Sequence, residues 1–428
     1  MRSFEESGRL LARAEQVIPL GSQTFSKSRT QYPLGVSPLF LERGDGARVW
    51  DVDGNCYVDF VSSLLSVTLG YRDPDVDEAV RRQLDSGVIL SLPHRLEMEV
   101  AERIVALVPC AEMVRFGKNG SDATSGAIRI ARAFTGRDHV AVCGYHGWQD
   151  WYIGSTARHR GVPDATRALT HNFQFNDLAS LERLCQAMPD QFAAIILEPM
   201  NLSWPEPGFL EGVRELATRH GAVLVFDETI TGFRFAMGGA QELFGVIPDL
   251  ATFGKGLANG YPISAVAGRR DIMLMMEEVF FSFTFGGEML SLAAARAVLD
   301  KLQREPVLET IGARGERLKQ KLAALIQGHQ LSHLFAVQGH PSWSFLTMTD
   351  APGATMYEMK TLLMQELHER GFLSVGSHNL NYAHSDADID GLIGAYDEVL
   401  PMIGAAAGAG DIGRLLRCEP LVPLFRVR

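Results

Sequence analysis

Between residues 111 and 268 the chain alternates short runs rich in apolar and β-branched residues with stretches that carry apolar side chains at helical spacing. The candidate strands are residues 113–116, 139–143, 193–197, 222–226, 250–253 and 263–267. The candidate helices between them are residues 121–134, 178–187 and 208–219. Strands that alternate with helices are typical of a parallel sheet flanked by helices. The sequence therefore predicts an α/β fold whose large domain has a mostly parallel central sheet.

On either side of this region the pattern is typical of a smaller α+β domain. The N-terminal side has a candidate helix at 4–17 and a hairpin around 48–55, where an Asp-Gly-Asn sequence supplies the turn. The C-terminal side has a long helical stretch, two strands and a helix at residues 289–325, 334–337, 343–348 and 355–370. A short Ala-Gly run at 404–410 is interpreted as a linker or tail. We expect segments 1–65 and 301–428 to form the small domain and 66–300 the large one.

Composition excludes several classes of function. The chain has 428 residues and a net charge of −11, without the clustered lysines and arginines that nucleic-acid binding demands. Its five cysteines are scattered and contain no Cys-x-x-Cys pair, which argues against a disulfide framework and a zinc site. No uninterrupted apolar run approaches membrane-spanning length, and the first residues lack the apolar core of an export signal. We expect a cytoplasmic protein without a metal, nucleic-acid or membrane partner.

Lys255 is the residue whose surroundings most strongly indicate chemistry. It lies between Gly254 and Gly256, downstream of an apolar run that ends at Asp227. An amine with little room for a side-chain partner becomes a nucleophile when desolvation lowers its pKa, and it then forms a Schiff base with an aldehyde. Asp227 would hold the protonated ring nitrogen of pyridoxal phosphate. Taken alone, Lys255 could equally be an exposed loop lysine.

A possible phosphate site lies at the start of the candidate helix 121–134. Residues 115–124 place a strand, a glycine-containing turn and a helix start in succession, and a helix N-terminus offers free N–H groups to an anion. Ser121 or Asp122 could equally be a plain N-cap. The spacing of Lys118 does not fit a nucleotide-binding phosphate loop, so ATP is disfavoured.

Three further strand ends carry polar or aromatic side chains. Tyr145, His146 and Trp148 follow the strand at 139–143, Glu198 follows the strand at 193–197, and Asp227 follows the strand at 222–226. Open α/β sheets bind ligands at the carboxyl ends of their strands. An aromatic ring there could stack on a flat cofactor, although ordinary packing of Tyr145 and a hydrogen-bonded His146 are also possible. A metal or glycosidase site is disfavoured because the acids lack histidine ligands or a sugar platform.

The ordered set of motifs resembles the class III pyridoxal-phosphate aminotransferases, and within them glutamate-1-semialdehyde aminomutase and its relatives. The motifs are Gly-Ser-Asp-Ala-Thr at 120–124, Tyr-His-Gly at 145–147, Glu-Pro at 198–199, Asp-Glu-x-x-Thr-Gly-Phe-Arg at 227–234 and Gly-Lys-Gly at 254–256. The resemblance covers nearly the whole chain and implies the type I fold of pyridoxal-phosphate enzymes. It implies that Lys255 carries the cofactor as a Schiff base and that Asp227 pairs with the ring nitrogen.

The resemblance also implies roles for residues around the cofactor. Gly120, Ser121 and Asp122 would cradle the phosphate, and Tyr145 would stack on the ring. Glu198 takes the position of an acid near the cofactor's phenolic oxygen. Thr284 resembles a threonine that reaches the phosphate bound by the other subunit, which requires a homodimer with active sites at the interface.

Departures from the family pattern bear on the reaction. Thr229 stands where a valine commonly packs under the ring, and Glu288 replaces an asparagine in the loop after Thr284. Lys27 lies in the stretch where the aminomutase has an arginine for the substrate carboxylate, and lysine offers a point charge rather than a bidentate fork. The acid that precedes Tyr-His-Gly in the aminomutase is also absent, since Val142, Cys143 and Gly144 stand there. The loss of this acid and of the arginine favours a neutral, sugar-like or aminocyclitol carbonyl substrate over glutamate semialdehyde. Lys27 and Trp148 are the candidates for the substrate side.

The sequence therefore predicts an aminotransferase that moves an amino group from an amino donor to an aldehyde or ketone, with Lys255 shuttling the proton. An intramolecular aminomutase is the alternative, because the two reactions differ only in whether the intermediate escapes. A catalytically silent binding protein on the same fold would be expected to have lost Lys255 or Asp227, and both are present.

Overall fold

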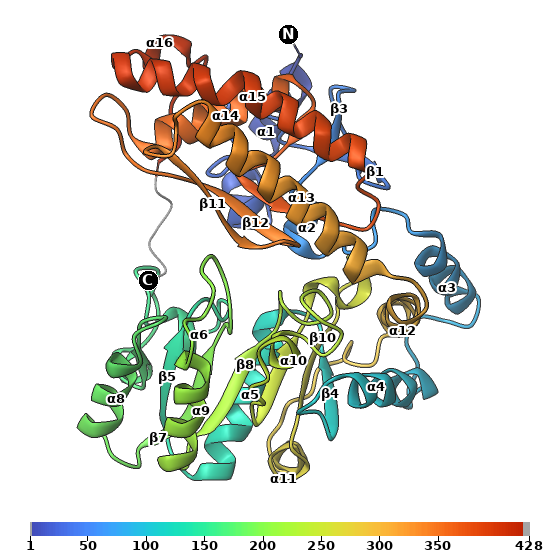
Figure 1. Ribbon diagram of the computed structural model, residues 1–428. Coiled ribbons are helices and arrows are strands. Elements are labelled where there is room, and N and C mark those ends of the chain that lie inside the picture. The colour runs from blue at the N-terminus through green and yellow to red at the C-terminus, as the bar shows by residue number, and fades with distance from the viewer. Residues whose placement is uncertain (1, 423–428) are drawn as a thin grey trace. The chain divides into compact units, whose positions relative to one another are not determined.

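The computed structural model describes residues 2–422, which divide into two compact units (Figure 1). One unit consists of residues 74–308, and the other combines the described residues up to 73 with those from 309 onward. The domain boundaries expected from the sequence, near 65 and 300, stay a prediction, and the last expected segment extends beyond the described residues.

The unit of residues 74–308 is built on a seven-stranded sheet with the order β4-β10-β9-β8-β7-β5-β6. Its strands are β4 (Met113–Gly117), β5 (His139–Cys143), β6 (Thr170–Asn172), β7 (Phe192–Leu197), β8 (Val223–Asp227), β9 (Leu250–Phe253) and β10 (Ser264–Gly268). The run from β9 to β6 is parallel, whereas β10 pairs antiparallel with both β4 and β9. The predicted mostly parallel sheet is confirmed. The strand β6 was not predicted, because its three residues are too few to give a sequence pattern.

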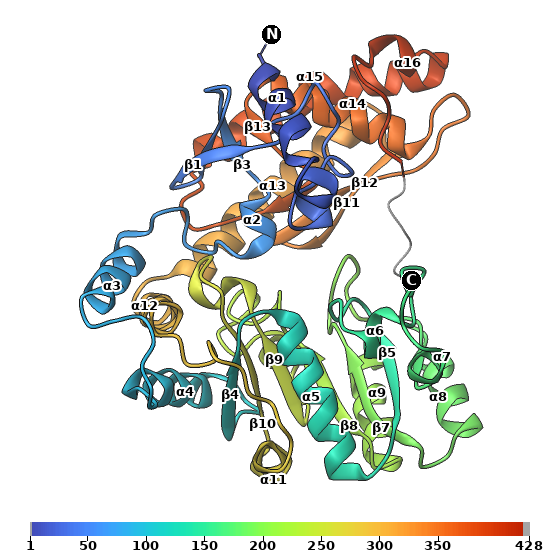
Figure 2. The same cartoon turned by 180° about the vertical axis from the view of Figure 1, so that it is seen from behind.

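Alternating side chains on the central strands bury both faces of this sheet. Ala194 and Ile196 of β7 pack into a core with α5 (Gly120–Thr135), while Ile195 and Leu197 pack with α8 (Leu178–Ala187) and α9 (Phe209–Arg219). The opposite views in Figures 1 and 2 show α9 in front of the sheet in one and α5 in front in the other. Each fully buried isoleucine contributes about 1.5–3 kcal/mol to the stability of the fold. Burial of β7 on both faces therefore holds this strand firmly in the centre of the sheet.

Other helices of this unit lie beside the sheet or in its connections. Three longer ones are α3 (Pro74–Leu84), α4 (Arg95–Leu107) and α12 (Met289–Arg304). Lys301 and Arg304 of α12 both form ion pairs with Asp75 of α3. The short elements are α6 (Asp150–Ile153), α7 (Asp164–Arg167), α10 (Ala240–Phe244), η3 (Lys255–Ala258), α11 (Arg270–Met273) and η4 (Leu274–Glu277).

The other unit contains two small sheets, β1-β2-β3-β13 and β11-β12-β14. Their strands are β1 (Leu41–Asp45), β2 (Arg48–Asp51), β3 (Cys56–Asp59), β11 (Phe335–His340), β12 (Trp343–Met348), β13 (Phe372–Leu373) and β14 (Ser377–Asn379). Its helical elements are α1 (Glu5–Ala14), η1 (Pro19–Gly21), η2 (Phe25–Lys27), α2 (Ser62–Leu65), α13 (Val307–Gly328), α14 (Met356–Glu369), α15 (Asp386–Ala409) and α16 (Ile412–Leu415), α13 starting two residues before the boundary. The mixture of strands and helices agrees with the predicted α+β pattern.

Two sequence expectations about helices are wrong. The helical stretch expected at 289–325 is two helices, α12 and α13, because Pro306 follows Glu305 at a point where the chain turns extended. The Ala-Gly run at 404–410 is not a linker, since it forms the end of α15, where Ala406 and Ala407 are buried. In the part of the chain that the structure describes, no helix is both long and apolar enough to cross a membrane.

Candidate active site

One pocket of about 360 Å³ opens at the carboxyl edge of the large sheet, beside the start of α5. It is lined by Asn119, Gly120, Ser121, Thr124, Tyr145, His146, Gly147, Trp148, Glu198, Asp227, Thr229, Ile230 and Lys255. These residues come from the ends of β5, β7, β8 and β9 and from the first turns of α5. Parallel strands carry their carboxyl ends to one edge, so segments far apart in the sequence meet there.

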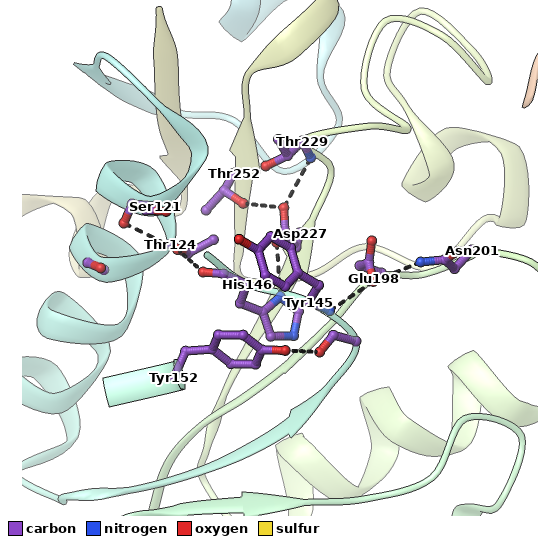
Figure 3. A network of polar contacts seen from close by, with 12 residues as sticks. Ser121, Thr124, Tyr145, His146, Tyr152, Glu198, Asn201, Asp227, Thr229 and Thr252 are labelled. Carbon is purple, nitrogen blue, oxygen red and sulfur yellow. Dashed lines mark hydrogen bonds and ion pairs between the residues drawn. The ribbon is translucent and has the colours of Figure 1, made fainter. Parts of the chain in front are cut away.

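Asp227 is the buried acid of this pocket, with 5% of its surface exposed. Its Oδ2 lies 2.9 Å from His146 Nδ1, and its Oδ1 accepts hydrogen bonds from the Thr229 N–H and the Thr252 hydroxyl, each at 3.1 Å (Figure 3). Burial alone would raise the pKa of Asp227, but the hydrogen bonds from His146 and Thr229 outweigh it and lower the pKa. Asp227 is therefore held as a carboxylate that can accept a hydrogen bond from a ligand.

His146 is oriented by this contact. A carboxylate can only accept, so His146 donates from Nδ1 to Asp227. The imidazole is 1% exposed, and its Nε2 has no hydrogen-bond partner among the described residues. Its ring lies edge-on to Tyr152 at 5.2 Å and stacks on Trp151 at 6.5 Å. Sequence reasoning did not place His146 in the site, although its position directly after Tyr145 was the available signal.

Lys255 begins η3 directly after β9 and lines the same pocket. Its backbone has φ of +43°, in the left-handed region that non-glycine residues seldom adopt. Such local strain concentrates at functional sites. Burial lowers the pKa of the Lys255 amine, and the charge of Arg234 lowers it further, while Glu198 and Asp227 act in the opposite direction. The lowered pKa increases the fraction of neutral amine, which is the nucleophilic form.

The start of α5 offers backbone donors to an anion. Asn119 caps the helix by accepting from the Asp122 N–H at 3.1 Å. The N–H groups of Gly120 and Ser121, in the first turn, have no acceptor among residues 2–422. Free N–H groups and the positive end of the helix dipole are suited to a phosphate. A side chain at Gly120 would bring a Cβ within 3.1 Å of Thr229 Cγ2, so glycine keeps this approach open.

The loop that carries Tyr145 is fastened to α5. The Trp148 N–H donates to Ser121 Oγ at 3.2 Å, and the Thr124 hydroxyl donates to the His146 carbonyl at 2.8 Å. Gly147 has φ of +104°, and a Cβ there would lie 2.2 Å from Ser121 Oγ. This close approach requires glycine. Tyr145 itself stays half-exposed at 48%, with its ring available to a ligand in the pocket.

Glu198, at the end of β7, forms the opposite wall. Its Oε2 accepts from the Tyr145 N–H and from Asn201 Nδ2, each at 3.0 Å (Figure 3). Gly144 makes room for this carboxylate, since a Cβ there would lie 2.6 Å from the same oxygen at a φ of +112°. The acid is thereby fixed beside the Tyr145 backbone.

The structure brings eight of the sequence-predicted site residues to one pocket, namely Gly120, Ser121, Tyr145, Trp148, Glu198, Asp227, Thr229 and Lys255. It does not bring Asp122 there, because the Asp122 carboxylate accepts the N–H groups of Lys118 and Asn119. Its expected part in holding a phosphate therefore has no support from the geometry. Thr284 is exposed and does not line the pocket. Lys27 belongs to the other unit, where its Nζ donates to Ser63 Oγ at 3.3 Å.

The donor set of this pocket fits pyridoxal phosphate. A helix start with unused N–H groups suits its phosphate, and the Asp227 carboxylate suits its protonated ring nitrogen. The buried Lys255 amine suits its aldehyde. The Thr229 hydroxyl lines the pocket and has no partner among the described residues, which leaves a buried polar atom for a ligand to satisfy.

Comparisons with known proteins agree with this chemistry. The family model described as aminotransferase class-III matches residues 31–380. A 3-aminobutyryl-CoA aminotransferase of Cloacimonas acidaminovorans (strain Evry) is 34% identical over 91% of this chain and 95% of its own length. A glutamate-1-semialdehyde 2,1-aminomutase of Syntrophobacter fumaroxidans is 40% identical over 72% of this chain and 73% of its own length.

A solved structure gives the same result for the fold. The internal aldimine form, with pyridoxal phosphate, of the FumI protein of Sphingopyxis sp. MTA144 superposes with a TM-score of 0.87 at 29% identity, covering 96% of this chain and 99% of that one. The predicted family, type I fold, cofactor and enzyme class are confirmed. The chain belongs to the class-III aminotransferases, which are pyridoxal-phosphate-dependent enzymes.

Proposed function

We propose that this enzyme transfers an amino group from an amino donor to an aldehyde or ketone acceptor and that Lys255 is its catalytic residue. The observation that carries the proposal is the meeting of the Lys255 amine and the Asp227 carboxylate in one pocket with the start of α5. Both pKa values are lowered, which shifts Lys255 toward the neutral amine and Asp227 toward the carboxylate, the forms that the reaction requires.

We assign the residues that hold the cofactor from the donors around the pocket. The N–H groups of Gly120 and Ser121 bind its phosphate, the Asp227 carboxylate its ring nitrogen, and the Tyr145 ring its face. Thr229 presents its methyl and hydroxyl groups opposite Gly120. When bound, pyridoxal phosphate supplies an electron sink for the carbon that carries the amino group.

Lys255 and its neighbours handle the proton. With pyridoxal phosphate bound, the Lys255 Nζ would act as the general base that takes the proton from the carbon carrying the amino group, and then as the acid that delivers it to the cofactor. Glu198 and Asp227 stabilise the protonated amine, and Arg234 favours the neutral one. Asp227 keeps its charge throughout because His146, Thr229 and Thr252 continue to donate to it.

The finer substrate assignment is a neutral, sugar-like or aminocyclitol carbonyl compound as the acceptor. It is supported by Lys27, which replaces the arginine fork of the aminomutase. The alternative, an intramolecular aminomutase, is supported by the 40% identity to a glutamate-1-semialdehyde 2,1-aminomutase.

The test follows the cofactor spectrum of the holoenzyme with amino donors such as L-glutamate and L-alanine. We expect conversion to the amine form of the cofactor with one equivalent of keto acid released into solution, and reversal when an aldehyde is added. Isomerisation of glutamate semialdehyde without release of any keto product would establish the aminomutase instead. Absence of any spectral change with a broad donor panel and with glutamate semialdehyde would refute both.

We also propose a homodimer with the active sites at the subunit interface. Two segments of the unit of residues 74–308 expose large apolar side chains, namely Val88, Ile89, Leu90, Leu92, Phe280, Phe283 and Phe285. The segments adjoin, since the Met289 N–H donates to the Val88 carbonyl at 2.8 Å. Exposed apolar side chains gathered on two adjoining segments favour an interface. The partner subunit's Thr284, between two of these phenylalanines in the sequence, would complete the phosphate site.

The proposed cytoplasmic location is supported by the cysteines. All five are unpaired in the structure, and Cys110, Cys143 and Cys185 are buried. Free thiols are typical of proteins kept in a reducing compartment.

A further inference from the structure

A second pocket, of about 480 Å³, lies at the same edge of the large sheet. It is enclosed by the ends of β5 and β6, the chain after α6 and the loop after β7, which contribute residues 142–144, 172–176, 155–157 and 201–203. We call it the amide pocket. Its volume falls within the range of small-molecule sites, roughly 300–1,000 Å³.

The amide pocket and the candidate active site share a wall. Gly144 lines the amide pocket and Tyr145, the next residue, lines the active site. Asn201 of the amide pocket donates from Nδ2 to Glu198 Oε2, the oxygen that also accepts the Tyr145 N–H (Figure 3). The two pockets therefore lie next to each other, with Gly144 and Asn201 on the side of the amide pocket that faces the active site.

The walls of the amide pocket are polar but uncharged. Among its fourteen lining residues, four carry side-chain amides and three carry hydroxyls, and none is Asp, Glu, Lys, Arg or His. Amides and hydroxyls both donate and accept hydrogen bonds, which matches the alcohol groups of a ligand. A phosphate or carboxylate would find no cation among these residues to pair with. Phe173 and Phe175 add apolar surface for the carbon skeleton.

Some of these polar groups are committed to the protein and others are free for a ligand. Asn176 is fixed by bonds to the Trp204 carbonyl and the Glu206 N–H, and the Thr156 hydroxyl by the Ile153 carbonyl and the Arg158 N–H. In contrast, Gln174 and Ser203 are exposed to solvent, and their side chains make no hydrogen bond to another described residue. The fixed groups shape the pocket, and the free ones are available for recognition.

We infer that the amide pocket binds the uncharged, hydroxyl-rich part of the carbonyl substrate, with Gln174 and Ser203 as specificity-determining residues. The inference rests on the proposed aminotransferase function and adds to it the place where the substrate's hydroxyl groups are held. It excludes substrates whose distal part is ionised. The reacting carbonyl carbon would lie on the other side of the shared wall, in the pocket that Lys255 lines.

The binding test uses the holoenzyme and saturation-transfer NMR with two neutral probes, myo-inositol and D-glucose, and two ionised ones, D-gluconate and glucose 6-phosphate. The double substitution Gln174→Leu with Ser203→Ala removes both free groups. Gln327→Leu, at an exposed position of α13 in the other unit, is the matched control. We expect saturable binding of the neutral probes, weakened about tenfold by the double substitution and unchanged by the control.

A kinetic test links the pocket to the reaction. D-Glyceraldehyde and propanal have the same three carbons and differ in two hydroxyl groups, so the ratio of their kcat/KM values reports recognition of those hydroxyls. The double variant should lower this ratio about tenfold while propanal reacts as in the wild type. Equal loss for both aldehydes would contradict a role in specificity.

The outcomes separate this inference from the function on which it rests. Binding of neutral probes without any reaction with amino donors would refute the aminotransferase and leave the ligand class of the pocket standing. If the enzyme reacts normally with amino donors, three results would refute the inference. They are that no neutral probe binds saturably, that the ionised probes bind more tightly than the neutral ones, or that the double substitution leaves the affinity for the neutral probes unchanged.

Discussion

Replacing His146 with phenylalanine tests how Asp227 keeps its charge. The substitution preserves a ring beside Trp151 and Tyr152 but removes the donor 2.9 Å from Asp227 Oδ2. A hydrogen bond to a charged group contributes about 1.5–3 kcal/mol, and each 1.36 kcal/mol corresponds to a tenfold change in the protonation equilibrium. Without His146 the unfavourable effect of burial on the carboxylate prevails, so its pKa rises. The ionised form is then lost at a higher pH.

The assay is the pH dependence of kcat/KM for the amino-donor half-reaction. In the His146→Phe variant the midpoint of the acid limb should move upward by about 1 to 2 pH units. Thr252→Val should move it less, because Asp227 Oδ1 keeps the Thr229 N–H. His139→Phe is the control, since His139 lies at the other end of β5 against His171. Identical acid limbs in wild type and His146→Phe would refute the reasoning.

Three further predictions concern stability, cofactor binding and assembly. Gly147→Ala should lower the free energy of unfolding by at least ~1 kcal/mol and weaken cofactor binding, measured by denaturant titration and cofactor fluorescence, because its Cβ would lie 2.2 Å from Ser121 Oγ. Gly136→Ala, also at positive φ but with open space around it, should leave cofactor affinity unchanged. The second prediction rests on three buried histidines. Burial lowers the pKa of His368 to about 4, that of His378 to about 3 and that of His384 to about 4. The unfolded chain binds protons at these positions below pH ~6.5, so stability should be greatest above that pH and fall as the pH drops toward 4, and a melting temperature that does not decrease between pH 7 and pH 5 would contradict this. Leu92→Glu, which places a charge on the exposed apolar surface, should shift sedimentation from dimer to monomer, whereas a monomeric wild type would exclude the homodimer.

The sequence predicted several strands and helices well because their signal is local. Strands such as Leu250–Phe253 and Trp343–Met348 and the helix Leu178–Ala187 have the predicted bounds, since period and flanking residues define them without tertiary information. The error at 404–410 has the opposite origin. Glycine and alanine are compatible with a linker, and only the burial of Ala406 and Ala407 keeps that segment helical.

The same distinction applies to the site. Strand-end positions indicated Asp227 and Glu198, because parallel topology brings such ends together, and the flanking glycines indicated Lys255. The role of His146 depends on a contact with a residue 81 positions later, across the intervening strand β7, which no local pattern reports. Asp122 is the opposite case. It is next to the phosphate-type turn in the sequence, but its carboxylate accepts the N–H groups of Lys118 and Asn119 and so belongs to the helix cap.

The central claim is that Lys255 is the residue that binds the cofactor. Borohydride reduction of the purified holoenzyme, followed by peptide mass spectrometry, locates the covalently attached pyridoxyl group directly. We expect one modified peptide per chain, with the group on Lys255, and loss of the attachment in Lys255→Ala. Attachment to Lys118, whose Nζ is 3.0 Å from Glu288 beside the same turn, or no attachment to any lysine, would contradict it.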